Sequence, residues 1–173
     1  MRPTILPGEF GIALVDLQDY FLYKVTEFEG KSASECLLGN ALSVVEFGVR
    51  HSLPIYLVRD FNLGDINPEI TVLLESYGPK ANIEKDSADG FDGTNFEREI
   101  NRYFVKNLLY AGISKTGCMK ATISSGISHG YNSFTSPDLM NRKGEINDWY
   151  KTNTNFFRDH KKLISFLEKK VLK

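Results

Sequence analysis

Three polar residues that lie far apart in the chain could act together in a reaction: Asp16, Lys85 and Cys118. Asp16 follows the apolar run GIALV, Lys85 ends the run ANIEK, and Cys118 lies in the turn after NLLYAGI. If these runs are parallel strands of one sheet, their carboxyl ends share an edge, where α/β proteins bind ligands. A carboxylate, an ammonium and a thiol would then meet at that edge.

Such a set predicts nucleophilic catalysis by a cysteine. A nearby cation or a helix N-terminus lowers the pKa of a thiol, and the thiolate is the reactive form. A carboxylate can take the thiol proton and later protonate a leaving group. We therefore expect Cys118 to be alkylated near neutral pH, and faster than Cys36, which we place in the apolar face of a helix as a buried residue.

Each of the three residues also has an ordinary structural interpretation when it is taken singly. Asp16 could cap the segment that follows its strand, and Lys85 could be a solvated charge. A lone cysteine such as Cys118 is most often a small buried hydrophobic residue. The catalytic interpretation depends on the three occurring together.

The elements that would position these residues alternate between strands and helices. Apolar and β-rich runs predict strands at residues 11–18, 53–61, 81–85, 107–113 and 131–136. Helical spacing and capping signals predict helices at about residues 32–52, 68–74, 95–103, 117–129 and 153–171. This order predicts an α/β fold, a single domain over residues 1–173 with three α/β/α layers and a mainly parallel sheet.

Composition narrows the class of protein. The chain has 173 residues, of which 42% are hydrophobic and 25% charged, values that are ordinary for a soluble domain. A net charge of −1 favours neither nucleic acid nor an anionic membrane as partner. The N-terminal MRPTILPGEF lacks the apolar stretch of a signal peptide, and two cysteines are too few for a disulfide scaffold. We therefore expect a cytoplasmic protein.

Three segments carry a resemblance to a known family: ALVDLQDYF, EKDSADGFDGTNFE and YAGISKTGCMKAT. In this order they resemble the signature segments of the isochorismatase-like cysteine hydrolases, which include nicotinamidases and N-carbamoylsarcosine amidohydrolases. The resemblance runs from about Gly11 to Asp138. It implies a Rossmann-like hydrolase fold, a small-molecule substrate and a homo-oligomer, either a dimer or a tetramer.

The resemblance also implies roles for the three polar residues. Asp16 matches the general base and acid, Lys85 matches the lysine that orients groups near the nucleophile, and Cys118 matches the nucleophile. It further implies a cis peptide bond at Ile113–Ser114. The backbone N–H groups of Ser114 and Cys118 would then form an oxyanion hole.

Three further residues are predicted to bind substrate. By resemblance, Phe21 lines the pocket and Gln18 is a polar residue beside the site. Phe91 is included because it lies in the loop after Lys85, which shapes the pocket.

The sequence departs from the metal-binding members of the family. Nicotinamidases carry an Asp-x-His pair after the second strand, whereas this chain has Asn62 in the histidine position of RDFN, after Asp60. Its three histidines, His51, His129 and His160, fall in predicted helices or helix ends and read as surface or helix-end residues. Zinc prefers imidazole or thiolate ligands. We predict no metal and no cofactor.

The predicted activity is hydrolysis of a C–N bond in a small amide or ureide, through a thioester on Cys118 and without a metal. One alternative is an isochorismatase-type vinyl-ether hydrolase, which would not need the cysteine. Another is a non-catalytic binding or scaffold protein with the same fold. Residues 139–155 show no clear periodicity and are predicted to form either a lid or a partner surface.

Overall fold

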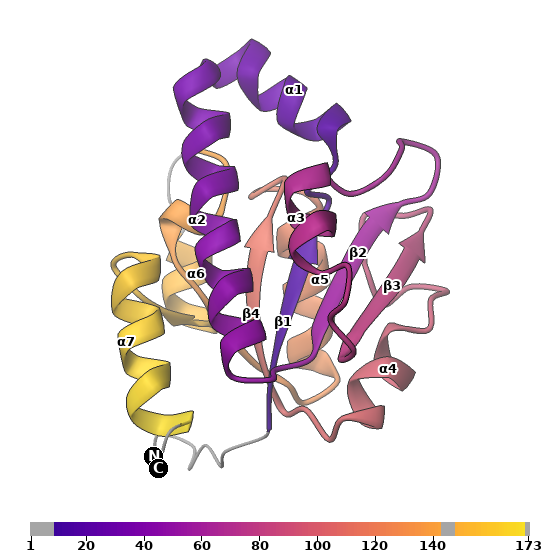
Figure 1. The fold of residues 1–173 in the computed structure, drawn as a ribbon, viewed down its shortest axis with the longest axis vertical. Coiled ribbons are helices and arrows are strands. Elements are labelled where there is room, and N and C mark those ends of the chain that lie inside the picture. The colour runs from indigo at the N-terminus through magenta and orange to yellow at the C-terminus, as the bar shows by residue number, and fades with distance from the viewer. Residues whose placement is uncertain (1–8, 143–147, 172–173) are drawn as a thin grey trace.

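One parallel sheet forms the centre of the molecule (Figure 1). The computed structural model describes residues 9–142 and 148–171. Within them lie six strands: β1 (Phe10–Val15), β2 (Ile55–Asp60), β3 (Lys80–Lys85), β4 (Asn107–Gly112), β5 (Asn132–Thr135) and β6 (Asn155–Phe156). Their spatial order is β3-β2-β1-β4-β5-β6, and every neighbouring pair is parallel. The prediction of a mainly parallel α/β sheet is confirmed.

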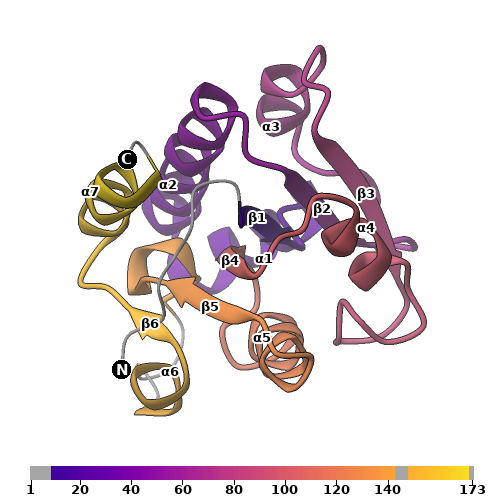
Figure 2. The same ribbon diagram turned by 90° about the horizontal axis from the view of Figure 1, so that it is seen from below.

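Helices cover both faces of this sheet. They are α1 (Asp19–Glu29), α2 (Lys31–Arg50), α3 (Pro68–Leu73), α4 (Phe96–Arg102), α5 (Cys118–Ser128), α6 (Asp148–Asn153), α7 (His160–Val171) and the short 3-10 helix η1 (Pro137–Leu139). Helices α2, α3 and α7 pack on one face, and α4, α5 and α6 contribute to the core on the other (Figure 2). Helix α1 crosses above the carboxyl ends of the strands (Figure 1). No helix in the described part of the chain is long and apolar enough to cross a membrane.

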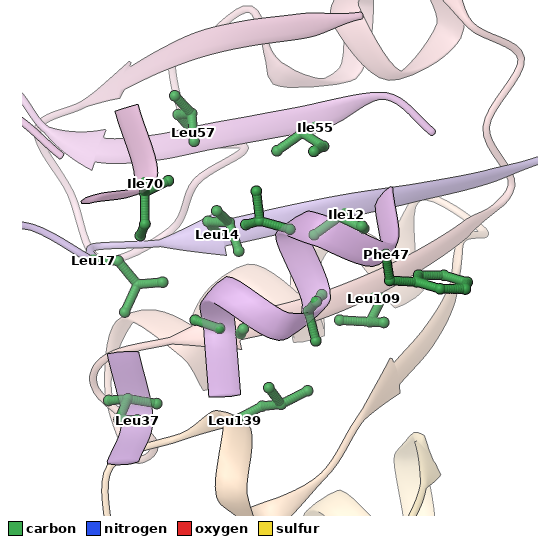
Figure 3. Packing of buried hydrophobic residues seen from close by; sticks show 14 of the residues in the cluster. Ile12, Leu14, Leu17, Leu37, Phe47, Ile55, Leu57, Ile70, Leu109 and Leu139 are labelled. Carbon is green, nitrogen blue, oxygen red and sulfur yellow. The ribbon is translucent and has the colours of Figure 1, made fainter. Parts of the chain in front are cut away.

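The burial of β1 on both faces explains its unbroken apolar run. All six of its residues are buried. Ile12 and Leu14 pack toward α2, whereas Ala13 and Val15 belong to the core on the opposite face (Figure 3). A strand covered by helices on both sides gains from apolar residues at every position, so the usual alternation is lost.

Two predicted features of the helices are wrong. The C-terminal helix begins at His160 instead of residue 153, because Asn155 and Phe156 pair with β5 as a strand. Asp159 Oδ1 caps the helix by accepting from the Lys162 N–H at 2.8 Å. Cys36 is exposed on α2, one position away from the buried Leu37. Helices α1 and α6 and strand β6 were not predicted.

Segment 139–155 is in part integrated with the sheet, and its role as a lid or a partner surface stays a prediction. Residues 143–147 lie outside the described residues. Of the rest, Gly112 of β4 forms a parallel bridge with Met140, and α6 and β6 pack against the sheet. The described parts of the segment therefore belong to the fold itself.

The carboxylate of Asp138 ties the end of the sheet to α7. It accepts from Ser136 Oγ at 2.6 Å and from the His160 N–H at 2.9 Å, and His160 Nδ1 lies 2.6 Å from Oδ2. His160 is the first residue of α7, which agrees with the helix-end alternative, and its side chain is buried. We expect Asp138→Ala to lower the free energy of unfolding in urea by about 1–3 kcal/mol, because buried donors lose their acceptor. Asp148→Ala, whose side chain is 93% exposed, is the control and should change it little; equal effects would contradict this role.

Candidate active site

Asp16 is positioned by the end of β1. Its N–H donates to Val58 O of the neighbouring strand at 2.8 Å, and its side chain is fully buried. The backbone of Asp16 has φ 53°, in the left-handed region that aspartate tolerates better than most non-glycine residues. A buried carboxylate with such a backbone is typical of a functional site.

Lys85 reaches the same point from β3. It is the last residue of that strand, and its ammonium Nζ lies 2.9 Å from Asp16 Oδ2 and donates to Ser87 O at 3.1 Å. The Lys85 and Asp16 side chains are 1% and 0% exposed. Beyond its contacts with Lys85 and the Cys118 thiol, neither oxygen of Asp16 accepts a hydrogen bond from any described group. The carboxylate thus keeps capacity to accept a proton or a substrate N–H.

Cys118 completes the set as the first residue of α5. The turn before it lies against β1 because β4 ends in a glycine: a Cβ on Gly112 would lie 2.0 Å from the carbonyl oxygen of Val15. Cys118 is half-buried, and its thiol interacts with both Asp16 and Lys85. The three residues that the sequence singled out do meet at one edge of the sheet.

The electrostatics of the thiol differ from the prediction. Burial raises the pKa of Cys118 to about 11, and the charge of Asp16 adds to this rise, while Lys85 opposes it. Burial also raises the pKa of Asp16 above 3.8, against the lowering effects of Lys85 and Cys118. The proximity of Lys85 does not outweigh desolvation and the charge of Asp16 at this thiol. Cys118 is therefore a protonated thiol at neutral pH, and alkylation faster than at the exposed Cys36 is no longer expected.

The turn before Cys118 carries backbone donors that could serve as an oxyanion hole. The peptide bond Ile113–Ser114 is cis, as the resemblance implied. The carbonyl of Ser114 accepts from the N–H groups of Gly117 and Met119. Among the described residues, the N–H groups of Ser114 and Cys118 themselves make no hydrogen bond, so both remain available to an oxyanion.

The three predicted substrate-binding residues lie in different places. Phe21 and Ser114 line the same cavity of about 170 Å³, whose lining does not include Asp16, Lys85 or Cys118. Gln18 instead holds the loop after β2: its amide donates to the carbonyls of Asp60 and Gly64 at 2.9 and 2.6 Å and accepts from the Asp60 N–H at 2.9 Å. With these bonds made, Gln18 is a structural residue.

The structure does not bring Phe91 to the triad. Its ring stacks on His129 with centroids 5.0 Å apart and contacts the helix α5 near Gly126. Eight residues separate Gly126 from Cys118, about 12 Å along a helix. The place of Phe91 in the loop after Lys85 was not enough to predict substrate binding, because an aromatic side chain in a loop can pack into the core instead.

The stretch with the altered metal motif forms a turn. Asp60 Oδ1 accepts from the Asn62 N–H at 2.9 Å. His51 packs on Phe47, and His129 stacks on Phe91, both away from this turn. Across residues 9–142 and 148–171, no three His, Cys, Asp or Glu side chains group as metal ligands do.

A group of polar residues around the turn before Cys118 was not predicted from the sequence. Lys115, in the middle of that turn, is 3% exposed, and its backbone contacts Asn141 and Tyr150. Asn141 in turn contacts Glu29 of α1. A lysine within an otherwise small-residue turn, SKTG, is the only signal that the sequence offers for this group.

A carboxylate, an ammonium and a thiol at the carboxyl edge of a parallel sheet define an α/β protein with a cysteine-centred candidate active site. The family model described as "Isochorismatase domain" matches residues 12–144. The chain therefore belongs to the isochorismatase-like hydrolase family. A comparison with curated proteins finds no match.

Solved structures share the fold at low sequence identity. YcaC from Pseudomonas aeruginosa, solved with hexane-2,5-diol and covalent acrylamide, has a TM-score of 0.80 at 16% identity, covering 98% of this chain and 85% of its own. A ribonuclease from Caenorhabditis elegans has a TM-score of 0.75 at 14% identity, covering 99% and 93%. N-carbamoylsarcosine amidase from Thermoplasma acidophilum has a TM-score of 0.68 at 16% identity, covering 86% and 94%. Likeness at these identities concerns the fold.

Proposed function

We propose that this protein is a cysteine hydrolase that cleaves a C–N bond of a small amide or ureide through a thioester on Cys118, without a metal. The observation that carries the proposal is the buried Asp16–Lys85 pair, 2.9 Å apart, in contact with the thiol of Cys118. That it works as a homo-oligomer in the cytoplasm stays a prediction from resemblance and composition.

The mechanism follows from the protonation states. Asp16, as a carboxylate, takes the thiol proton while Cys118 Sγ attacks the carbonyl carbon, so no preformed thiolate is needed. The N–H groups of Ser114 and Cys118 stabilise the tetrahedral oxyanion. Asp16 then gives its proton to the departing nitrogen as the C–N bond breaks. Water, losing a proton to the same carboxylate, then attacks the thioester; the acid leaves as the C–S bond breaks, and Asp16 returns the proton to the sulfur of Cys118.

The charge of Lys85 supports these steps. Its ammonium offsets the negative charge of Asp16 in a site from which water is largely excluded, so the carboxylate remains available as a base although it is buried. Asp60 and Asn62 could offer a metal ion only oxygen ligands, whereas zinc prefers nitrogen or sulfur ligands. This supports a hydrolase that works without a metal. The amidase and the acrylamide adduct among the structures of this fold are consistent with C–N chemistry and a reactive side chain.

Mass spectrometry of the intact protein tests the proposal. The protein is incubated with nicotinamide, benzamide, oxamate and N-carbamoylglycine, quenched in acid and weighed, and ammonia release is followed in parallel. We expect an acyl adduct that peptide mapping places on Cys118, and the same adduct in Cys36→Ala. The proposal would be refuted if the protein formed no adduct and released no ammonia with these compounds and with a wider amide panel.

The pH dependence distinguishes a neutral thiol from a thiolate as the resting nucleophile. We expect kcat/KM for amide hydrolysis to rise as the pH passes the pKa of Asp16, which burial raises above 3.8, and then to stay level through neutral pH. The pKa of Cys118, about 11, places thiol ionisation above that plateau. A rise between about pH 7 and 9 would instead indicate attack by a preformed thiolate.

A further inference from the structure

The turn that presents the Ser114 N–H is held from outside by the segment after β5. The Lys115 N–H donates to Asn141 Oδ1 at 2.8 Å, and the hydroxyl of Tyr150 donates to the Lys115 carbonyl. Asn141, Lys115 and Tyr150 are 8%, 3% and 1% exposed. Water competes poorly for buried partners of this kind, so these bonds fix the backbone direction on both sides of Lys115.

The peptide that follows Ser114 is thereby fixed at both of its ends. Its carbonyl oxygen accepts from the N–H groups of Gly117 and Met119, and its N–H, that of Lys115, donates to Asn141. This peptide and the Ile113 N–H, which donates to Val15 O at 3.0 Å, flank the peptide that carries the Ser114 N–H and restrict its direction from both sides. The hydrogen bond of Asn141 thus sets the direction of a donor that should meet the oxyanion.

Glu29 decides which way the Asn141 amide faces. Glu29 Oε1 accepts from Asn141 Nδ2 at 3.0 Å, and Oε2 accepts from the Arg142 N–H at 2.7 Å. An ionised carboxylate only accepts, so the amide nitrogen of Asn141 must face Glu29 and its oxygen must face Lys115. Glu29 ends α1, the helix that also carries Phe21, and Phe21, Glu29, Ser114 and Asn141 line the same cavity.

We propose that Asn141 is a positioning residue for the oxyanion-binding turn and that Glu29 holds its amide in the accepting orientation. The proposal rests on the proposed hydrolase function. It predicts that acylation of Cys118 depends on the pair Glu29–Asn141, although neither side chain contacts the thiol in the described contacts.

Reversal of the hydrogen-bond polarity tests this pair. In Asn141→Asp, the new carboxylate has no N–H to donate to Glu29, and repulsion between the two carboxylates moves the acceptor away from the Lys115 N–H, so the turn is no longer held. In the double variant with Glu29→Gln, the glutamine amide can donate to Asp and accept from the Arg142 N–H, which restores the bonds with donor and acceptor exchanged. We expect kcat for ammonia release, from whichever panel amide is hydrolysed, to fall about 10- to 100-fold in Asn141→Asp. The double variant should recover most of the loss.

Asn107→Asp is the matched control. Asn107 is 2% exposed at the amino end of β4, where Oδ1 accepts from Asn132 and Nδ2 donates to Glu9 O, so the change buries a similar charge at the opposite edge of the sheet. It should lower stability without lowering kcat.

The outcomes separate the two proposals. Wild-type kcat in Asn141→Asp, no recovery in the double variant, or an equal loss in Asn107→Asp would overturn the positioning role while the hydrolase function stands. An inactive wild-type protein that forms no adduct would overturn both.

Discussion

Replacement of Cys118 by alanine is expected to lower kcat for amide hydrolysis by about 10⁴-fold or more, because the bond-forming atom is removed and water must attack the amide directly. Ammonia release, measured at saturating substrate, gives the effect. The variant should fold as the wild type does, since Cys118 is half-buried and alanine differs from it only by the sulfur.

The exposed Cys36 provides the control for this result. Cys36→Ala should keep full activity, and it should still form the acyl adduct that Cys118→Ala lacks. Activity retained in Cys118→Ala would favour the vinyl-ether hydrolase, which does not need the thiol. If neither variant nor the wild type turned over any amide, a binding or scaffold role would be the better interpretation.

Lys85→Met is expected to lower the free energy of unfolding by about 3–5 kcal/mol at neutral pH, because it leaves the buried carboxylate of Asp16 without its cation. Activity should fall as well, by about 10²-fold or more, since the pKa of Asp16 rises further and less of the base is ionised. Urea unfolding and ammonia release measure the two effects.

The stability loss in Lys85→Met should depend on pH in a defined direction. The folded-state pKa of Asp16 is raised above 3.8, so the stability that its protonation contributes is complete below that value and is lost as the pH rises through the raised pKa. In the variant, the uncompensated charge therefore costs most at neutral pH, and the difference from wild type should narrow as the pH falls toward 3.8.

A surface lysine serves as the control for both measurements. Lys106 also forms an ion pair, with Glu9 Oε1 at 2.6 Å, but its side chain is 67% exposed. Lys106→Met should cost about 1 kcal/mol or less at any pH, because water screens the pair. A Lys85→Met variant that is no less stable than Lys106→Met would show that the buried pair contributes little.

The sequence by itself determined the first five strands of the described sheet, their alternation with helices and the three residues of the candidate triad. These features depend on local pattern: strands buried on both faces are continuous apolar runs, and a parallel sheet brings their carboxyl ends to one edge. Asp16 directly follows such a run, Lys85 ends β3 and Cys118 follows the turn after β4, so their meeting could be predicted from topology. The cis peptide bond came from the family resemblance and not from any local pattern.

Only the tertiary structure decided how the site is held and charged. Glu29 and Asn141 are 112 residues apart, and no local pattern links them. The role of Gln18 as a loop clamp and the place of Phe91 on α5 likewise depend on which backbone groups and core surfaces the folded chain offers them. The raised pKa of Cys118 has the same origin, because desolvation is set by every neighbouring element together, whereas sequence shows only the nearby cation and helix end.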